Sequence, residues 1–193
     1  MIGIIDYGAG NAASVKNALD KLGVGSVITS NIEKMEKCDS LILPGVGAFG
    51  NAMDSLKGKI QMINDWKKPF LGICLGMQVL FERSDENPEA EGLGIIKGSV
   101  RKFNGIRTPQ IGWNKIENVK GQLFDKEGFV YFVNSYYCKP DANENVTTST
   151  TNYGIEFVSS VRKNNFYGVQ FHPEKSSEFG LKILERFARL SKC

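Results

Sequence analysis

The first half of the chain alternates short, continuous apolar runs with segments of helical periodicity. The apolar runs are candidates for buried strands, and they lie at residues 2–6, 26–29, 40–43 and 70–73. Segments with helical spacing lie at residues 14–22, 49–66 and 75–83, and the first of these ends at Gly23. Because strands alternate with helices, the pattern predicts a mainly parallel sheet with helices on both faces.

After residue 93 the helical segments give way to a succession of short β-rich runs. They lie at residues 95–103, 111–117, 129–138, 146–151, 155–162 and 165–171, and they indicate hairpins and antiparallel additions to the sheet. The last segment, residues 177–190, carries apolar side chains at helical spacing and is expected to close the fold. The prediction is therefore an α/β fold in a single domain that spans residues 1–193.

The composition is typical of a folded globular protein. Of the 193 residues, 41% are hydrophobic and 23% are charged. The net charge of +3 comes without a long basic run, which argues against a nucleic-acid partner. No stretch approaches the roughly 18 apolar residues that span a bilayer, and the first residues lack the charged segment of a signal peptide. A cytoplasmic protein with no membrane partner is therefore expected.

The scarcity of histidine limits the chemistry that the chain can perform. His172 is the one histidine in the sequence, so any mechanism that depends on an imidazole must use it. The cysteines Cys38, Cys74, Cys138 and Cys193 are far apart and form no Cys-x-x-Cys pair. Neither a zinc site nor a disulfide framework is indicated, and we expect no metal or other cofactor.

Cys74 stands where an apolar strand candidate meets a helical segment, in a Gly-x-Cys-x-Gly sequence at residues 72–76. This is the sulfur counterpart of a nucleophile elbow, a strained turn in which bulky neighbours would clash. The positive end of the following helix would lower the pKa of the thiol and favour the nucleophilic thiolate. Taken by itself, the motif fits a buried structural cysteine equally well.

His172 and Glu174 lie at the end of the apolar run over residues 165–171, with Pro173 between them. A strand period of two would place the imidazole and the carboxylate on one side of the backbone, and Pro173 restricts how the chain leaves the sheet. Together with Cys74 they make a candidate nucleophile, base and orienting group. The alternative for a lone histidine is a hydrogen-bonded residue of the core.

A third segment, residues 43–50, contains Gly45, Gly47 and Gly50 between a strand candidate and a helical segment. Such a loop can bring backbone N–H groups close to a reacting atom. It could make a tight turn, which is the commoner use, or cradle a phosphate. Beside a thiol nucleophile it could also form an oxyanion hole.

In these features the chain resembles the class I glutamine amidotransferases, and within that family the glutaminase subunits of imidazole glycerol phosphate synthases. The likeness runs nearly from end to end and is carried by residues 5–11, 44–49, 72–78, 112–114, 131–133, 135–136 and 168–176. It implies a flavodoxin-like three-layer fold and a glutaminase that hydrolyses glutamine to glutamate and ammonia. It also implies a heterodimer, in which a cyclase partner uses the ammonia to form imidazole glycerol phosphate in histidine biosynthesis.

The resemblance implies a role for each matching residue. Cys74 would be the nucleophile, His172 the acid and base, and Glu174 the group that orients the imidazole. Further implied residues fall in three groups: Gly45, Val46, Gly47 and Leu75 at the oxyanion hole; Gln78, Glu86, Ser135 and Tyr136 at the substrate; and Asn11, Trp113 and Lys175 at the partner subunit. The alternatives are a solvated loop charge for Glu86 and a core aromatic for Trp113.

Two positions depart from the family pattern, because Gln110 and Asn134 each stand where a histidine is common. Neither belongs to the triad, but both are expected near the substrate and partner surfaces. The departure leaves open a second client, a synthase that amidates sugars for surface polysaccharides. A third hypothesis, a noncatalytic binding module on the same fold, is disfavoured by the intact Cys74, His172 and Glu174.

Overall fold

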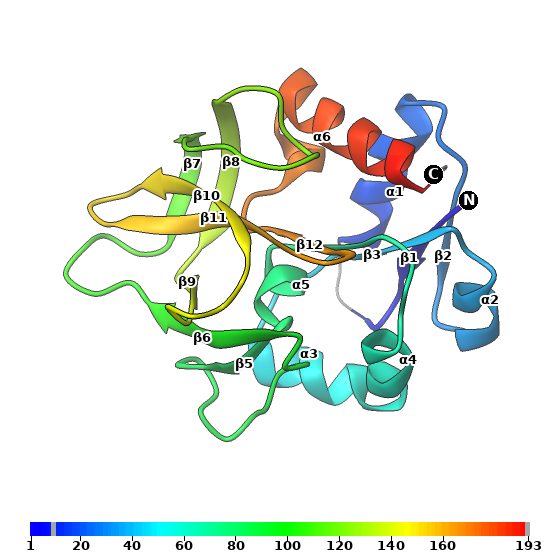
Figure 1. The fold of residues 1–193 in the computed structure, drawn as a ribbon, viewed down its shortest axis with the longest axis horizontal. Helices are drawn as coiled ribbons and strands as arrows, with labels where there is room; N and C mark the ends of the chain where they lie inside the picture. Colours follow the sequence, from blue (N-terminus) through cyan, green and yellow to red (C-terminus); the bar gives the residue numbers. More distant parts are fainter. Residues whose placement is uncertain (9–10, 192–193) are drawn as a thin grey trace.

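The computed structural model describes residues 1–8 and 11–191 of the chain, and ten of the strands in these residues form one sheet (Figure 1). One half of the sheet is parallel, in the order β2 (Ser26–Thr29), β1 (Ile2–Ile5), β3 (Ser40–Leu43), β4 (Phe70–Ile73) and β12 (Phe166–Val169). This order is that of flavodoxin-like folds. The predicted parallel sheet is therefore confirmed.

Helices cover both faces of this parallel half. On one face lie α1 (Ala12–Lys21) and α6 (Ser177–Leu190), and on the other lie α3 (Phe49–Leu56) and α4 (Ile60–Asn64) (Figure 1). Successive strand residues point to opposite faces, so Ile42 packs with α1 and α6 while Leu41 and Leu43 pack with α3 and α4. The three-layer arrangement is confirmed. Of the helices that the structure describes, none is long and apolar enough to cross a membrane.

The other half of the sheet is largely antiparallel. Beyond β12 it continues through β11 (Glu156–Lys163), β9 (Tyr136–Pro140), β6 (Ile96–Lys102) and β5 (Phe81–Ser84), and β10 (Thr147–Asn152) pairs with β11. The β12–β11, β11–β9, β9–β6 and β11–β10 pairs are antiparallel, whereas β5 and β6 run parallel to each other. The antiparallel additions that the sequence predicts are confirmed.

A separate two-stranded sheet joins β7 (Gln110–Ile116) to β8 (Gly128–Asn134). In its antiparallel register Trp113 lies opposite Tyr131, and Ile111 lies opposite Val133. Residues that are directly opposite share a face of the sheet, so these four side chains lie on one side. The other side packs into the core through Phe132.

Three predicted elements have different bounds in the structure. The helix expected over residues 75–83 is wrong beyond its first turn, because α5 spans Leu75–Gln78 and β5 begins at Phe81. Residues 75–81 of this run are all buried, and a short buried run does not distinguish a helix from a strand. The strand over residues 129–138 divides at Ser135, since β8 pairs with β7 whereas β9 pairs with β6. The helix over residues 49–66 is interrupted by η1 (Lys57–Lys59), which contains a glycine.

One helix, α2 (Ile32–Glu36), is not among the predicted elements. Its signal in the sequence is Asn31, whose side-chain oxygen accepts a hydrogen bond from the Lys34 backbone N–H at 3.0 Å. Asparagine is a favoured residue at this capping position. The helix is short, and periodicity alone does not reveal an element of this length.

Candidate active site

Cys74 sits on a strained turn at the end of β4. Its backbone has φ of 54° and ψ of −108°, a conformation that costs a non-glycine residue on the order of 1–3 kcal/mol. The turn is tight, because a Cβ atom at Gly76 would overlap the carbonyl oxygen of Leu43. The Cys74 N–H donates to Val169 O at 2.8 Å and ties the turn to β12. Residues 72–76 therefore have the geometry of a nucleophile elbow.

The short length of α5 changes the electrostatic argument for Cys74. A helix macrodipole is the sum of aligned peptide dipoles, so the single turn from Leu75 to Gln78 contributes less than the longer helix that the sequence predicts. The N–H groups of a first turn still have no intrahelical acceptor, and the N–H of Leu75 directly follows the thiol residue. Groups outside α5 therefore matter more for the state of the sulfur.

The packing of β12 beside β4 brings His172 to Cys74. The two strands are parallel, with Val169 opposite Ile73, so the residues after each strand leave the sheet at the same edge. In open α/β sheets, sites lie at the carboxyl ends of the strands. The His172 N–H donates to Tyr131 O at 2.9 Å, which anchors the residue to β8. The imidazole is buried and lines the same cavity as Cys74.

Glu174 reaches the imidazole across a short helical turn. His172 Nδ1 and Glu174 Oε1 are 2.8 Å apart, and both side chains are buried. The expected explanation, a strand period of two, is wrong: β12 ends at Val169, and Glu174 lies in the 3-10 helix η2 (Pro173–Lys175). Proline is favoured at the first position of a helix because its φ is already helical. Pro173 thereby supports the turn that carries the carboxylate back to the ring.

Asn11 is a second partner of this carboxylate. Its Nδ2 donates to Glu174 Oε1 at 2.6 Å and lies 3.4 Å from His172 Nδ1. Asn11 precedes α1 and is 4% exposed. The resemblance implies a partner contact at this residue, but its side chain lies in the interior beside Glu174. The partner contact of Asn11 stays a prediction.

The array of Cys74, His172 and Glu174 favours a charged imidazole. Burial opposes the charge, but the interactions of His172 with Cys74 and Glu174 outweigh burial and raise the pKa of His172 to about 10. Burial also opposes ionisation of Glu174, yet hydrogen bonds to His172 and Asn11 lower the pKa of this carboxyl group. The array can hold an imidazolium between a carboxylate and a sulfur, which suits a thiolate nucleophile.

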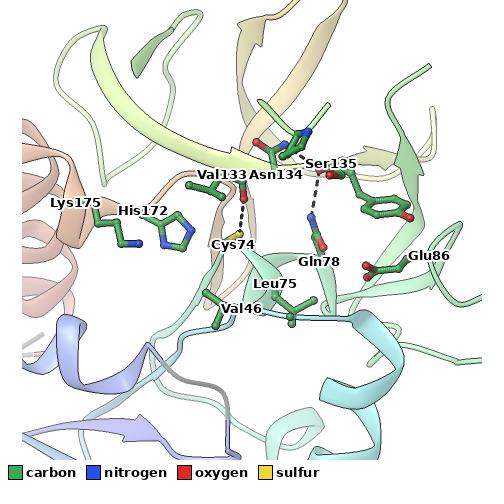
Figure 2. Close-up of a pocket in the computed structure, with 13 residues that line it drawn as sticks. Val46, Cys74, Leu75, Gln78, Glu86, Val133, Asn134, Ser135, His172 and Lys175 are labelled. Carbon is green, nitrogen blue, oxygen red and sulfur yellow. Dashed lines mark hydrogen bonds between the residues drawn. The ribbon is translucent and has the colours of Figure 1, made fainter. Parts of the chain in front are cut away.

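A cavity of about 260 Å³ opens onto Cys74. Figure 2 shows His172 and Lys175 on one side of Cys74, and Gln78 and Glu86 on the other. The predicted site residues in its lining are Val46, Gly47, Cys74, Leu75, Gln78, Glu86, Ser135, Tyr136, His172 and Lys175. Pro109, Val133 and Asn134 complete the lining. The structure thus brings together most of the residues that the sequence singled out, from both halves of the chain.

Two buried glutamines connect the cavity to the sulfur. Gln78 Nε2 donates to Tyr136 O at 3.3 Å and to Gln170 Oε1 at 3.1 Å. Gln170 Nε2 in turn lies 3.6 Å from Cys74 Sγ. Gln170 is not among the predicted site residues. The available signal was its place two residues before His172, in the same strand-end segment.

Glu86 lines the cavity and also stabilises a helix. Its Oε2 accepts a hydrogen bond from the backbone N–H of Phe49, the first residue of α3, at 2.8 Å. A carboxylate at this end complements the helix dipole. Burial and the carboxylates of Glu86 and Asp85 raise the pKa of Tyr136, which keeps the phenol neutral. Glu86 is a half-buried, hydrogen-bonded carboxylate rather than a solvated loop charge.

The glycine-rich segment runs beside α5. A Cβ atom at Gly45 would come within 2.8 Å of Leu75 Cβ, so this position requires close backbone approach. Val46 and Gly47 line the cavity, and Gly47 has φ of 107° with open space around it. Of the four expected oxyanion-hole residues, Val46, Gly47 and Leu75 therefore lie on the wall of one cavity with Cys74, whereas Gly45 is not in its lining.

The other described cysteines are placed differently. Cys38 and Cys138 are buried and unpaired, and burial raises the pKa of both thiols. Thiols in such surroundings are poorly reactive. Cys193 lies outside the described residues. Within residues 1–8 and 11–191, no group of three His, Cys, Asp or Glu side chains is placed to hold a metal ion.

Residues 3–190 match the class-I glutamine amidotransferase family. The chain belongs to this family. The imidazole glycerol phosphate synthase subunit HisH of Methanocaldococcus jannaschii is 49% identical, over 98% of this chain and 100% of the relative. The chloroplastic imidazole glycerol phosphate synthase hisHF of Arabidopsis thaliana is 46% identical over 97% of this chain, which covers 34% of that longer protein. A crystal structure of a glutamine amidotransferase superposes with a TM-score of 0.79 at 19% identity, over 100% of this chain and 99% of the other, and shows a shared fold.

This amidotransferase has an exposed apolar face on its two-stranded sheet. Ile111, Trp113 and Phe129 are 63%, 52% and 60% exposed. They share one side of the sheet with Val133 and with Tyr131, whose ring lies edge-on to Trp113 at 6.0 Å. We call these five residues the β7–β8 apolar face. Scattered apolar residues are ordinary on a surface, but a contiguous group indicates an interaction site. Trp113 is therefore a surface aromatic and not a core residue.

The strand that carries this face also contacts the amidotransferase site. Val133 lines the cavity, and its carbonyl oxygen lies 3.8 Å from Cys74 Sγ. Tyr131 O accepts the backbone N–H of His172 at 2.9 Å, and Tyr131 N–H donates to Ser176 Oγ at 2.9 Å. The backbone of β8 therefore joins the apolar face to the residues around the sulfur.

Gln110 and Asn134, the two departures from the family pattern, face each other across β7 and β8. Both are buried, and Asn134 also lines the cavity. The expectation that both lie near the substrate and partner surfaces stays a prediction. Neither is on the β7–β8 apolar face, because the alternation along each strand directs them to the other side. The departures therefore leave the exposed face unchanged.

Proposed function

We propose that this chain is the glutaminase subunit of an imidazole glycerol phosphate synthase. It would hydrolyse glutamine to glutamate and ammonia and deliver the ammonia to a cyclase partner in histidine biosynthesis. The observation that carries this proposal is the buried array of Cys74, His172 and Glu174 on the wall of a cavity. The near full-length likeness to a synthase subunit named HisH supports the choice of client.

The first half of the reaction forms a thioester. The Cys74 thiolate attacks the side-chain amide carbon of glutamine, and the carbonyl oxygen takes up negative charge. Backbone N–H groups of the Val46–Gly47 segment and of Leu75 stabilise this oxyanion. The carbon–nitrogen bond then breaks, and the His172 imidazolium gives its proton to the departing nitrogen, which leaves as ammonia.

The second half of the reaction consumes water. Neutral His172 takes a proton from a water molecule while the resulting hydroxide attacks the thioester carbon. The carbon–sulfur bond breaks, which restores the Cys74 thiolate and the imidazolium and yields the carboxylic acid that ionises to glutamate. Glu174 keeps the imidazole in orientation through both steps. Gln78, Glu86, Ser135 and Tyr136 hold the substrate, with the Glu86 carboxylate close to its α-ammonium group.

The β7–β8 apolar face is the proposed docking surface for the cyclase. Aromatic residues are enriched where binding energy concentrates in interfaces, and Trp113 lies in the middle of this face. Lys175 is exposed at the cavity and belongs to the same proposed surface. The Arabidopsis relative supports a cyclase partner, since this chain accounts for only 34% of that synthase. Because Gln110 and Asn134 are buried, they give no support to a sugar-amidating client.

We also place the protein in the cytoplasm. The described cysteines are all free thiols, which fits a reducing compartment. The proposed hydrolysis of glutamine also requires that the Cys74 thiol stay reduced.

Affinity labelling tests the assignment of the nucleophile. A chloroketone analogue of glutamine should bind in the cavity and alkylate Cys74, and peptide mapping should find the added mass there rather than at Cys38, Cys138 or Cys193. Excess glutamine should slow the labelling, and Cys74→Ala should abolish it. Labelling spread evenly over the four cysteines would argue against an activated thiol at Cys74.

A further inference from the structure

The side chain of Gln170 contacts the sulfur of Cys74 directly, and the proposed reaction does not yet use it. Gln170 follows β12, is 0% exposed, and its backbone N–H donates to Ser159 O at 2.9 Å. Its Nε2 lies 3.6 Å from Cys74 Sγ. Burying a side-chain amide costs free energy unless the amide is hydrogen-bonded. The hydrogen-bond partners of Gln170 therefore indicate its role.

The orientation of this amide follows from its neighbours. A backbone carbonyl can only accept a hydrogen bond, so Gln78 must present its Nε2 to Tyr136 O, 3.3 Å away. The same Nε2 lies 3.1 Å from Gln170, which must therefore offer its oxygen to receive the hydrogen bond. The nitrogen of Gln170 is left facing the sulfur. The carbonyl group of Tyr136 thus determines which atom is oxygen and which is nitrogen in the side-chain amides of Gln78 and Gln170.

The thiol and the thiolate of Cys74 use different partners in these surroundings. The thiol can donate to Val133 O, 3.8 Å from Sγ. The thiolate can only accept, and the Gln170 amide supplies a hydrogen atom from within the core. A hydrogen bond to an ionised group shifts the equilibrium between its neutral and ionised forms, here thiol and thiolate, by roughly tenfold to a hundredfold. Because α5 has a single turn, this direct donor adds to a small helix dipole.

We propose that Gln170 is a catalytic residue that donates its amide N–H to the Cys74 thiolate, and that Gln78 holds the amide in this orientation. The inference rests on the proposed function, in which Cys74 attacks as a thiolate. It gives Gln78 a positioning role in addition to substrate contact. A substrate glutamine that hydrogen-bonds to Gln78 would then affect the orientation of the Gln170 amide, and through it the hydrogen bond to the Cys74 thiolate.

The test measures how alkylation of Cys74 by iodoacetamide depends on pH, in the absence of glutamine, with the modified peptide read by mass spectrometry. Gln170→Met keeps the side-chain volume and removes the donor. Gln170→Glu also removes the donor but keeps an acceptor for Gln78. Gln110→Met is the matched control, because Gln110 is a buried glutamine with no described hydrogen bond to Cys74 or Gln78.

We expect both Gln170 variants to slow the alkylation of Cys74 at pH 7 by roughly tenfold or more and to move its midpoint to higher pH. Gln110→Met should leave the pH dependence of Cys74 alkylation unchanged. Cys38 and Cys138 should stay unreactive in every variant, which reports intact packing. In a glutaminase assay the Gln170 variants should lose kcat with little change in KM.

The inference is overturned if folded Gln170→Met alkylates like the wild type, or if Gln110→Met shifts the profile as far. Should the charge in Gln170→Glu prevent folding, the uncharged Gln170→Met decides the question. A wild-type protein with an activated Cys74 that still fails to hydrolyse glutamine when the cyclase and its nucleotide substrate are present would refute the proposed function and leave the Gln170 contact standing.

Discussion

Asn11 and His172 contact the same oxygen of Glu174, at 2.6 Å and 2.8 Å, so one carboxylate oxygen is held from two directions. The first contact fixes the carboxylate to the start of α1, and the second fixes the imidazole to the carboxylate. An orienting group needs this kind of restraint, because a rotating carboxylate would not select one ring orientation. The predictions for Glu174 and His172 follow from this geometry.

Glu174→Gln keeps the shape of the side chain and removes its charge. The amide cannot favour the imidazolium as the carboxylate does, so turnover should fall by roughly a hundredfold to ten-thousandfold, as for orienting groups of other triads. Binding of glutamine should change far less, because Glu174 lies outside the cavity lining. Steady-state kinetics will separate the two effects. An unchanged kcat would mean that another group orients His172.

The titration of His172 gives a direct test of the electrostatics. His172 is the one histidine in the sequence, so the imidazole signals of the untagged protein need no assignment by mutation. Its folded-state pKa of about 10 lies above the unperturbed value near 6.5. The ring should therefore stay protonated in NMR spectra at pH 8, while the urea-unfolded chain should titrate near 6.5.

The same titration of Glu174→Gln tests the direction in which Glu174 shifts the pKa of His172. Hydrogen bonding to Glu174 raises the pKa of His172 and burial lowers it, so removal of the carboxylate should move the midpoint down. A wild-type imidazole that is already neutral at pH 8 would contradict the charged array of Cys74, His172 and Glu174.

Cys74→Ala should abolish glutamine hydrolysis and leave the rest of the protein in place. The change removes a sulfur atom from a cramped turn and introduces no polar group, so the thermal unfolding midpoint should stay close to that of the wild type. The complex with the cyclase should still use added ammonium salts, because only the source of ammonia is lost. Glutamine-dependent turnover at the wild-type rate would show that Cys74 is not the nucleophile.

The sequence predicted the parallel half of the fold and the position of Cys74 because both depend on local patterns. Buried strands are continuous apolar runs, and the elbow needs glycines at fixed offsets from the thiol residue. The contact of Cys74 with His172 could also be expected, since each follows a strand of the same parallel sheet. These inferences need only the order of the elements and their ends.

The contacts of Asn11 and Gln170 could not be predicted in this way. Asn11 and His172 are 161 residues apart, and their contact depends on how α1 meets η2. Gln170 and Cys74 are 96 residues apart, and the direction of the glutamine side chain depends on Gln78. The length of α5 was mispredicted for a related reason, because tertiary pairing of β5 with β6 ends the helix early.

Trp113→Ala should weaken binding of the cyclase without harming basal glutamine hydrolysis. Truncation of a central interface tryptophan commonly costs about 2 kcal/mol or more, roughly a thirtyfold loss of affinity. Stability should change little, because the ring is 52% exposed. Trp113→Phe is the matched control and should retain much of the affinity, since it keeps an aromatic ring on the face. Equal affinities for the wild type and Trp113→Ala, measured by calorimetry, would exclude this face as the docking surface.

Hydrolysis of glutamine should be coupled to docking of the cyclase subunit. The isolated chain should hydrolyse glutamine poorly, and the cyclase should activate it, most strongly when the cyclase carries its own nucleotide substrate. The physical reason lies in the Val46–Gly47 segment, where a peptide can flip because Gly47 at φ 107° has open space around it. Loss or gain of one oxyanion donor changes the rate by roughly a hundredfold to a thousandfold, which sets the expected activation.

Gly47→Ala separates a backbone switch from other routes of activation. No neighbour would clash with the added Cβ atom, so the substitution acts on the backbone alone, and it disfavours the positive φ seen here. If this φ belongs to the resting conformation, basal glutamate formation should rise and the ratio of activated to basal rates should fall. Glutamate release is to be measured for both proteins with and without the cyclase and its nucleotide. High basal activity in the wild type that neither the cyclase nor its nucleotide changes would refute the coupling. An unaltered ratio of activated to basal rates in Gly47→Ala would place the switch elsewhere. The β8 contacts to His172 and Cys74 would then be the remaining structural link to the β7–β8 apolar face.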